Sequence, residues 1–254
     1  MRRVTGSSGI CVETRDPGAS CDGSRVHLGL TRLVASVTAL AICNVVAAQE
    51  SRGHCDGPRE VRETTLESIQ AFVGGRDMTV LTFAGYSGAG YEDPAAMQKQ
   101  AASILDAQDP AKTLINIGAT ASGIGAVYEI AKQKGFTTMG IVSTLARDEE
   151  VALSDCVDYV FYIADETWGG EIPGRNRLAP TSTTLVEAST SFVAIGGGDV
   201  ARDEMLAARR AGKAVTFIPA DMNHELARQK AQQKGAPPPT DFRGSAHAAL
   251  APGT

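Results

Sequence analysis

Three glycine-rich segments follow apolar runs that are typical of β-strands. The clearest follows Phe192–Ile195 and consists of Gly196, Gly197 and Gly198, with a polar, helix-favouring stretch after it. Consecutive glycines let the backbone take positive φ and let another group approach the main chain. A helix that begins at such a turn directs free N–H groups and its positive end toward it. The pattern therefore suits an anion such as phosphate, and a tight structural connection is the alternative.

The two other turns combine glycine with hydroxyl side chains. After Thr79–Phe83 come Gly85, Ser87 and Gly88, and after Leu114–Ile117 come Gly118, Thr120, Ser122 and Gly123. Neither turn has the lysine of a Walker A loop or the strict Gly-x-Gly-x-x-Gly spacing of a dinucleotide site. Backbone donors and hydroxyls at corresponding strand ends can contact one ligand. We therefore expect a phosphate or ribose site, with three purely structural turns as the alternative.

Acidic, basic and aromatic candidates lie close to these turns in the sequence. Asp203 and Glu204 begin the helix after the third turn, where a carboxylate suits acid/base chemistry or contact with ribose hydroxyls. Trp168, Arg175 and Arg177 belong to a long polar segment of the kind that often covers ligand sites. The tryptophan is suited to stack on a base or sugar, and the arginines to bind a phosphate. A tryptophan that only anchors its loop on the core is the alternative.

Short apolar runs alternate with amphipathic segments along most of the chain. The expected strands are Thr79–Phe83, Leu114–Ile117, Thr138–Val142, Tyr159–Ile163, Phe192–Ile195 and Ala214–Ile218. The expected helices are Pro94–Ala107, Ile124–Lys134, Thr183–Ser189, Val200–Ala211 and Asn223–Lys234. This alternation predicts an α/β fold with a doubly wound, mostly parallel, Rossmann-like sheet and helices on both faces. Ligands of such sheets bind at the carboxyl ends of the strands, where every glycine turn of this chain falls.

The N-terminal region has the pattern of an export signal. Basic residues precede the apolar segment 32–48, which ends in small residues and is shorter than the ~20 residues of a spanning helix. We expect cleavage after Ala48, a secreted or periplasmic protein, and no stable membrane span afterwards. An uncleaved membrane anchor or a buried helix is the alternative. Residues 1–31 show no periodicity and are expected to be a disordered or non-native extension.

The remaining boundaries follow from composition. We expect a linker with a short helix over 49–76, the Rossmann-like domain over 77–235 and a flexible tail over 236–254 that contains a run of three prolines. Cleavage after Ala48 would leave Cys55 and Cys156 as the remaining cysteines. In an exported chain these two form a disulfide or remain unrelated thiols, and the sequence leaves both open.

Composition excludes several classes of partner. The formal net charge of -5 gives no basic footprint for nucleic acid, and aromatic residues make up only 5% of the 254 residues. No Cys-x-x-Cys or His-x-x-x-His spacing occurs, so we expect no metal and no cofactor. The expected partner is a small phosphate-bearing ligand, a nucleotide or a derivative. The oligomeric state stays open, a homo-oligomer included.

The stretch from Thr79 to Gly235 resembles the SLOG superfamily of Rossmann-like proteins, which includes the LOG-type nucleoside 5'-monophosphate phosphoribohydrolases, once described as lysine decarboxylases. Residues 114–143 look like the glycine turn, helix and return strand of that family. Residues 85–97 are similar to its first loop. Phe192–Asp203 resembles the hallmark Pro-Gly-Gly-x-Gly-Thr-x-x-Glu, with Asp203 at the position of the glutamate.

The chain departs from that family at its catalytic positions. Asp199 and Val200 stand at the third glycine and the threonine of the hallmark, so the hydroxyl that contacts phosphate is missing. The catalytic arginine of the family lies on the helix before the hallmark strand, and Thr183–Ser189 contains none. The resemblance therefore implies the fold more firmly than the reaction.

Three functions remain after these observations. The first is an exported domain that binds a nucleotide, nucleotide-sugar or related phosphate ligand. The second is a phosphoribohydrolase-like enzyme that cleaves an N-glycosidic bond, with Asp203 or Glu204 stabilising the sugar cation and Arg175 or Arg177 orienting the phosphate. The third is a structural or interaction protein without a ligand. The missing threonine and arginine favour binding over turnover.

Overall fold

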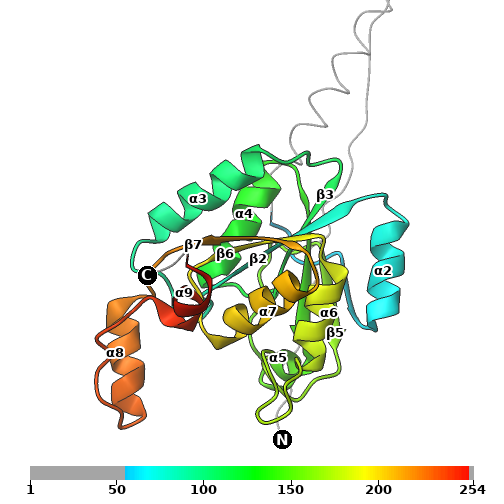
Figure 1. The fold of residues 1–254 in the computed structure, drawn as a ribbon. Helices are drawn as coiled ribbons and strands as arrows, with labels where there is room; N and C mark the ends of the chain where they lie inside the picture. The colour runs from blue at the N-terminus through cyan, green and yellow to red at the C-terminus, as the bar shows by residue number, and fades with distance from the viewer. Residues whose placement is uncertain (1–54, 252–254) are drawn as a thin grey trace, which may run out of the picture. The chain divides into compact units, whose positions relative to one another are not determined.

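The computed structural model describes residues 55–251, which lie in one compact unit. In this part of the chain a parallel sheet has the strand order β1-β5-β4-β3-β2-β6-β7 (Figure 1). The strands are β1 (Glu60–Glu63), β2 (Thr79–Gly85), β3 (Thr113–Ile117), β4 (Thr137–Ser143), β5 (Tyr159–Ile163), β6 (Ser191–Ile195) and β7 (Ala214–Ile218). The expected extension 1–31 and signal-like segment 32–48 lie outside the described residues. No helix in the described residues has the length and apolar character needed to cross a membrane.

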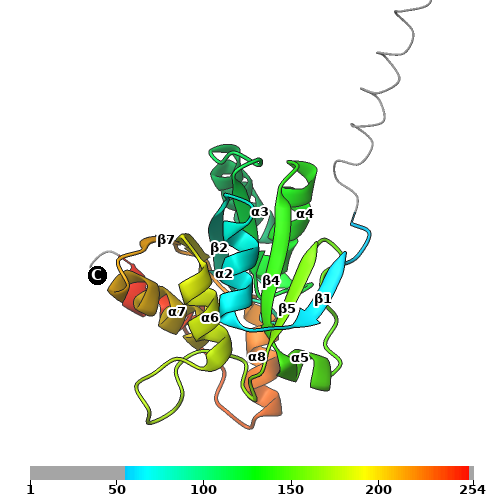
Figure 2. The same ribbon diagram turned by 90° about the vertical axis from the view of Figure 1, so that its right-hand side faces the viewer.

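Helices cover both faces of this sheet. They are α2 (Leu66–Gly74), α3 (Pro94–Asp106), α4 (Ala126–Gln133), α5 (Thr144–Asp148), α6 (Pro180–Ala188), α7 (Asp199–Arg210), α8 (His224–Gln233) and α9 (Gly244–Leu250), with a 3-10 turn at Gly123–Gly125 before α4. Buried side chains of α3 and α4 belong to the core on one face, and those of α2, α6, α7 and α9 to the core on the other. Figures 1 and 2 show how these helices are arranged around the sheet. The predicted doubly wound, Rossmann-like α/β fold is confirmed.

Burial on both faces explains why the sequence pattern predicts the inner strands. All five residues of β3 are buried, and its apolar run is interrupted only by Asn116. The amide of Asn116 donates to the hydroxyl of Thr82 on β2 at 3.0 Å and accepts from the backbone N–H of Ile141 on β4 at 3.3 Å. A strand buried on both sides needs a continuous apolar sequence, and its rare polar group needs such partners.

The sheet reverses its order beside β2. The chain proceeds from β2 through β3 and β4 to β5 on one side, and then crosses to β6 and β7 on the other side. The turns after β2 and β6 lead to helices on opposite faces, α3 and α7. Such a reversal opens a crevice at the carboxyl ends of the two strands, which is the usual ligand site of this architecture.

An edge strand replaces part of the linker expected over 49–76. Glu60–Glu63 pairs with β5 in parallel, with Val61 opposite Val160, and Figure 2 shows the two strands side by side. Its side chains alternate between partly buried and exposed, as on an edge strand. Four residues with three charges carry too weak an apolar pattern to be recognised in the sequence. The expected short helix of this region is α2, which is followed by Gly75.

A disulfide joins Cys55 to Cys156, so the alternative of two unrelated thiols does not hold. The two cysteines precede β1 and β5, the strands that pair at this edge of the sheet.

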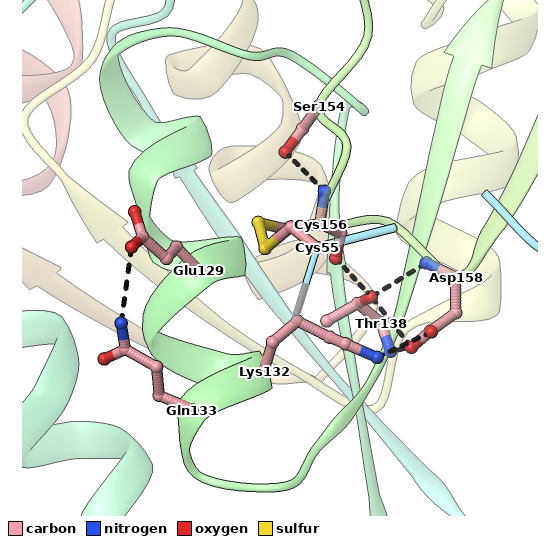
Figure 3. The surroundings of a disulfide bond; sticks show 8 residues. All are labelled: Cys55, Glu129, Lys132, Gln133, Thr138, Ser154, Cys156 and Asp158. Atoms are coloured by element: carbon pink, nitrogen blue, oxygen red, sulfur yellow. Dashed lines mark hydrogen bonds and ion pairs between the residues drawn. A yellow bond between two sulfur atoms is a disulfide. The ribbon is translucent and has the colours of Figure 1, made fainter. Parts of the chain in front are cut away.

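A cluster of hydrogen-bonded polar side chains lies next to the disulfide (Figure 3). The carboxylate of Asp158 accepts from the backbone N–H of Thr138 at 2.9 Å and pairs with Lys132 at 2.7 Å. The Thr138 hydroxyl donates to the carbonyl oxygen of Cys156 at 2.8 Å.

A helix lies within the stretch 236–254, where a flexible tail was expected. Residues 244–250 form α9, in which Ala246 is fully buried and Leu250 is 4% exposed. The backbone N–H of Ala246 donates to the carbonyl oxygen of Gly197 at 3.2 Å. A seven-residue helix of small residues has no recognisable pattern, because its stability comes from packing on the rest of the domain.

Candidate functional site

One cleft of about 450 Å³ lies at the carboxyl ends of β2, β3 and β4, and α6 and α7 form its far wall. Its lining is mainly apolar and includes Phe83, Ile117, Ile141, Val142, Ala146, Leu153, Leu185, Val200 and Ala201. The polar lining residues are Ser87, Thr120, Ser122, Ser143, Thr181 and Glu204. Apolar walls with a few converging polar groups are typical of small-molecule sites.

The first glycine turn contributes Gly85, Ser87 and Gly88 to the cleft. Tyr91 fixes the base of this turn, because its hydroxyl donates to the carbonyl oxygen of Ile195 at 2.8 Å and accepts from the N–H of Tyr86 at 3.2 Å. A Cβ at Gly85 would collide with the Tyr91 hydroxyl, so this glycine is required by packing. A Cβ at Gly88 would meet only the Lys230 amine, at 3.9 Å. The tip of the turn therefore has free space around it.

The second turn contributes Gly118, Thr120 and Ser122. Its start is held by the buried Tyr128, whose hydroxyl accepts from the N–H of Ala119 at 3.2 Å and donates to the carbonyl oxygen of Met139 at 2.8 Å. This contact supports Ala119 in the left-handed region, at φ 56°. Tyr128 thereby positions the turn from beneath without facing the cleft.

Gly123 allows the second turn to pack closely against the first. It is not among the residues that line the cleft. A Cβ at this position, which has φ 59°, would collide with the carbonyl oxygens of Tyr86 and Ser87. The next backbone N–H, that of Ile124, donates to the carbonyl oxygen of Tyr86 at 2.7 Å. Gly123 is therefore required by packing between the two turns.

The third turn packs beside the first, but its glycines do not line the cleft on which the sequence was expected to bring all three turns together. None of Gly196, Gly197 and Gly198 lines the cleft. A Cβ at Gly196 would collide with the ring of Tyr86, and one at Gly197 would lie 2.6 Å from the Cβ of Ala201 and 3.4 Å from that of Ala246. Gly196 therefore makes room for Tyr86, and Gly197 makes room for the close packing of α7 and α9.

The two adjacent acids of α7 face different surroundings, because neighbouring residues of a helix point about 100° apart. Glu204 lines the cleft, whereas Asp203 does not. The carboxylate of Asp203 accepts from the backbone N–H of Glu171 at 2.8 Å and pairs with Arg202 at 2.8 Å. It therefore holds the segment after Trp168 in place.

Glu204 is buried against α6. The hydroxyl of Ser182 donates to its Oε1 at 2.6 Å and accepts from the backbone N–H of Gly170 at 2.7 Å. Burial raises the pKa of Glu204 to about 7, which outweighs the opposing effect of the Ser182 hydrogen bond. At neutral pH a substantial fraction of this side chain is therefore an uncharged carboxylic acid.

Trp168 and the two arginines of the same segment are separated in the structure. Trp168 lines the cleft and is 50% exposed, so its ring is accessible to a ligand. Arg175 and Arg177 are exposed on a loop whose ends meet at the bridge between Glu171 and Leu178, and neither lines the cleft. The lining residues that the structure describes include no lysine and no arginine.

Two polar residues of the cleft were not recognised in the sequence. Ser143 ends β4, and its hydroxyl donates to the carbonyl oxygen of Asp165 at 2.7 Å. Thr181 lies in the first turn of α6 and is 6% exposed, and its Oγ1 has no hydrogen-bond partner in the described part of the chain. Their position at a strand end and a helix start was the only available signal. Within residues 55–251 no group of three side chains is arranged to hold a metal.

Solved structures with similarity to this chain include TM1055, a structural-genomics target, with 20% identity and a TM-score of 0.41 over 54% of this chain and 72% of that one. The molybdenum cofactor carrier protein of Chlamydomonas reinhardtii has 20% identity and a TM-score of 0.40, over 55% of this chain and 76% of that one. DNA processing protein A of Streptococcus pneumoniae has 14% identity and a TM-score of 0.40, over 70% and 64%. No family model and no curated protein matches the chain.

Proposed function

We propose that the cleft binds a small nucleotide-class ligand: a nucleotide, a nucleotide-sugar or a related phosphate compound. The observation that carries this proposal is the convergence of the first two turns, through Ser87, Thr120 and Ser122, on one cleft of about 450 Å³. Ligand pockets commonly have volumes of ~300–1,000 Å³. A half-exposed tryptophan at the same cleft adds a flat surface for a base.

The phosphate belongs at the two turns in this proposal. Ser87 and Ser122 are exposed, and Gly88 leaves room for a close approach to the backbone. The cleft lining contains no basic side chain, so hydroxyl and N–H donors would bind the phosphate, and the Lys230 amine, which donates to the carbonyl oxygen of Gly88 at 2.9 Å, lies next to the first turn.

We further propose that the chain is a divergent SLOG-type protein that is exported to an oxidising compartment. The disulfide between Cys55 and Cys156 supports export, since such bonds persist mainly outside the cytosol. The hallmark resemblance around the third turn supports the family assignment, although α9 packs against Gly197 of that turn. Sequencing of the mature N-terminus from the native source tests export, and a mature chain that retains residues 1–48 would contradict cleavage.

A phosphoribohydrolase-like reaction is the second candidate, because a carboxylic acid with a pKa of about 7 lines the cleft. Such a group is suited to protonate a leaving group near neutral pH. In this candidate Glu204 takes the role alone, since Asp203 is bound to the loop after Trp168. The cleft also lacks an arginine that would orient the phosphate, so we rank turnover below binding.

Direct titration tests the binding proposal. Trp168 is the only tryptophan of the chain, so its fluorescence reports on the cleft without interference from another indole. The full chain is titrated with AMP, ADP-ribose, NAD and ribose 5-phosphate, and each titration is repeated by calorimetry. We expect saturable binding of at least one compound, with a thermal stabilisation of about 2.7 kcal/mol at a ligand concentration of 100 Kd. Failure of all four compounds would contradict the proposal.

Chromatographic assay for free adenine after incubation with AMP separates the two candidates. A binding protein releases no base. Release of adenine that is lost in Glu204→Gln would instead support the enzyme.

A further inference from the structure

Thr181 lines the cleft with a hydroxyl group that no other group of the described residues satisfies. Thr181 is 6% exposed and lines the cleft, and within the described residues its Oγ1 has no hydrogen-bond partner. Its backbone is fixed, because its N–H donates to the carboxylate of Asp165 at 2.9 Å. Buried hydroxyls in folded proteins nearly always have a partner, and the described part of the chain leaves the hydrogen-bonding capacity of this one for a bound molecule.

The wall next to Thr181 is polar but lacks a fixed charge. From α6 it presents the side chain of Thr181, and from α7 it presents the carboxyl group of Glu204, which accepts from the buried hydroxyl of Ser182 at 2.6 Å. The neighbouring charges face elsewhere: Arg202 pairs with both Asp199 and Asp203. The negative charge of Asp203 further favours the protonated form of Glu204, next to the larger effect of burial on its pKa. A protonated carboxyl group offers one donor and one acceptor.

A phosphate would be poorly placed at this wall. The carboxylate form of Glu204 would repel a phosphate, and the described lining contains no cation to compensate. An uncharged group with a donor and an acceptor instead matches the Thr181 hydroxyl and the Glu204 carboxyl group. The apolar neighbours Leu185 and Val200 strengthen these hydrogen bonds by excluding water.

We infer that Thr181 and Glu204 form the specificity-determining wall of the cleft and bind an uncharged hydrogen-bonding group of the ligand. The phosphate then lies at the opposite end, over the turns that carry Ser87 and Ser122. This inference rests on the proposed function, because it concerns the same cleft, and it adds the orientation of the ligand and the residue that selects it.

The variant Thr181→Val tests this inference, because valine has nearly the same shape but no hydroxyl. Thr183→Val is the matched control, since Thr183 lies two residues further along α6 and does not line the cleft. Affinities for adenosine and for AMP are measured by calorimetry with the full chain. We expect Thr181→Val to bind both compounds about 10-fold more weakly than the wild type and Thr183→Val to bind within twofold of it.

Thermal unfolding without ligand distinguishes a ligand contact from a structural role. Because the Thr181 hydroxyl has no hydrogen-bond partner in the described residues, its removal leaves no other polar group unsatisfied. The melting temperature of Thr181→Val should therefore equal or exceed that of the wild type. A variant that binds more weakly because it is misfolded would instead melt at a lower temperature, and this result would overturn the inference.

A pH series adds the contribution of Glu204. Adenosine binding to the wild type should weaken as the pH rises from 6 to 8, because the wall acquires a negative charge, whereas Glu204→Gln should bind with little dependence on pH. Wild-type binding of AMP together with unchanged affinity in Thr181→Val would overturn this inference and leave the proposed function standing. Absence of binding to the wild type by every nucleotide tested would instead remove the proposed function itself.

Discussion

Ser182 and Glu204 join α6 to α7 through a hydrogen bond of 2.6 Å at the wall of the cleft. The same hydroxyl accepts from the backbone N–H of Gly170, so the loop after Trp168, α6 and α7 meet at one oxygen atom. The carboxyl group of Glu204 is therefore part of the structural support of the cleft as well as of its lining.

Stability should fall with rising pH because of Glu204. Burial raises the pKa of this group from 4.5 to about 7, so the folded chain keeps the proton over a range in which the unfolded chain loses it. The contribution is complete below pH 4.5 and is lost as the pH rises to 7. We expect this group alone to lower the unfolding free energy by up to about 3 kcal/mol between pH 4.5 and pH 8. Urea unfolding of Glu204→Gln should show a flatter pH profile than the wild type. The exposed Glu149→Gln should retain the wild-type profile.

A side chain at Gly118 should block the ligand. A Cβ there would have only the carbonyl oxygen of Ile141 within 4 Å, at 4.0 Å, so Gly118→Val fits the fold while it fills part of the cleft. We expect at least 10-fold weaker nucleotide binding by calorimetry, with little change in melting temperature. Gly198→Val is the control, because a Cβ at Gly198 also has free space but lies outside the cleft lining. Equal affinities of the two variants would show that the ligand lies elsewhere.

Loss of the Tyr128 hydroxyl should loosen the second turn. Tyr128→Phe leaves the buried N–H groups of Ile117 and Ala119 without their acceptor, which should lower the unfolding free energy by about 1–3 kcal/mol. Nucleotide affinity should also fall, since Ala119 is adjacent to Gly118. Tyr159→Phe provides a comparison in which the ring packs against Phe72. A Tyr128→Phe variant as stable as this comparison would contradict the assigned role.

The disulfide should contribute strongly to stability because it closes a long loop. Cys55 and Cys156 are 101 residues apart, and removal of a native bond of this kind typically costs about 2–5 kcal/mol. We expect the double variant Cys55→Ser, Cys156→Ser to unfold at a lower urea concentration than the oxidised wild type. Dithiothreitol should lower the midpoint of the wild type to the same value and leave the double variant unchanged. Sensitivity of the double variant to the reductant would implicate other cysteines.

Packing of α9 should be measurable with one substitution. Leu250 is 4% exposed, so Leu250→Ala should lower the unfolding free energy by about 2–4 kcal/mol. Leu226→Ala on α8 makes the same chemical change at a side chain that is 39% exposed, and should alter stability by about 0.5 kcal/mol or less. Equal effects of the two substitutions would favour the flexible tail that the sequence predicts.

The fold was predictable because its central strands are buried on both faces. The apolar runs at Thr79–Phe83 and Leu114–Ile117 are explained by strands that are buried on both faces. The ends of β2 and β3 lie within two residues of the predicted ends. The edge strand β1 and helix α9 escaped prediction because neither has an apolar pattern of its own. Both depend on contacts with residues distant in the chain, which local sequence does not encode.

The candidate site was predictable where local geometry determines it. The first two turns follow from glycine and hydroxyl residues at strand ends, and both line the cleft. The different surroundings of Asp203 and Glu204 depend on the rotation of α7 about its axis, which the sequence does not fix to within one residue. The packing of Tyr86, α7 and α9 against the glycines of the third turn involves residues distant in the chain, and Thr181 carries no motif. These features required the coordinates of the neighbouring helices.

The disulfide determines how the domain responds to tension on its N-terminal side. Cys55 lies before β1, and Cys156 lies before β5, the strand that pairs with β1. A force applied upstream of Cys55 is therefore transmitted through the disulfide to the start of β5. The four-residue edge strand β1 lies within the loop that the disulfide closes, so this force does not act on it while the disulfide is intact. Mechanical unfolding from this end must therefore begin at β5 or beyond, deeper in the domain than the position of β1 suggests.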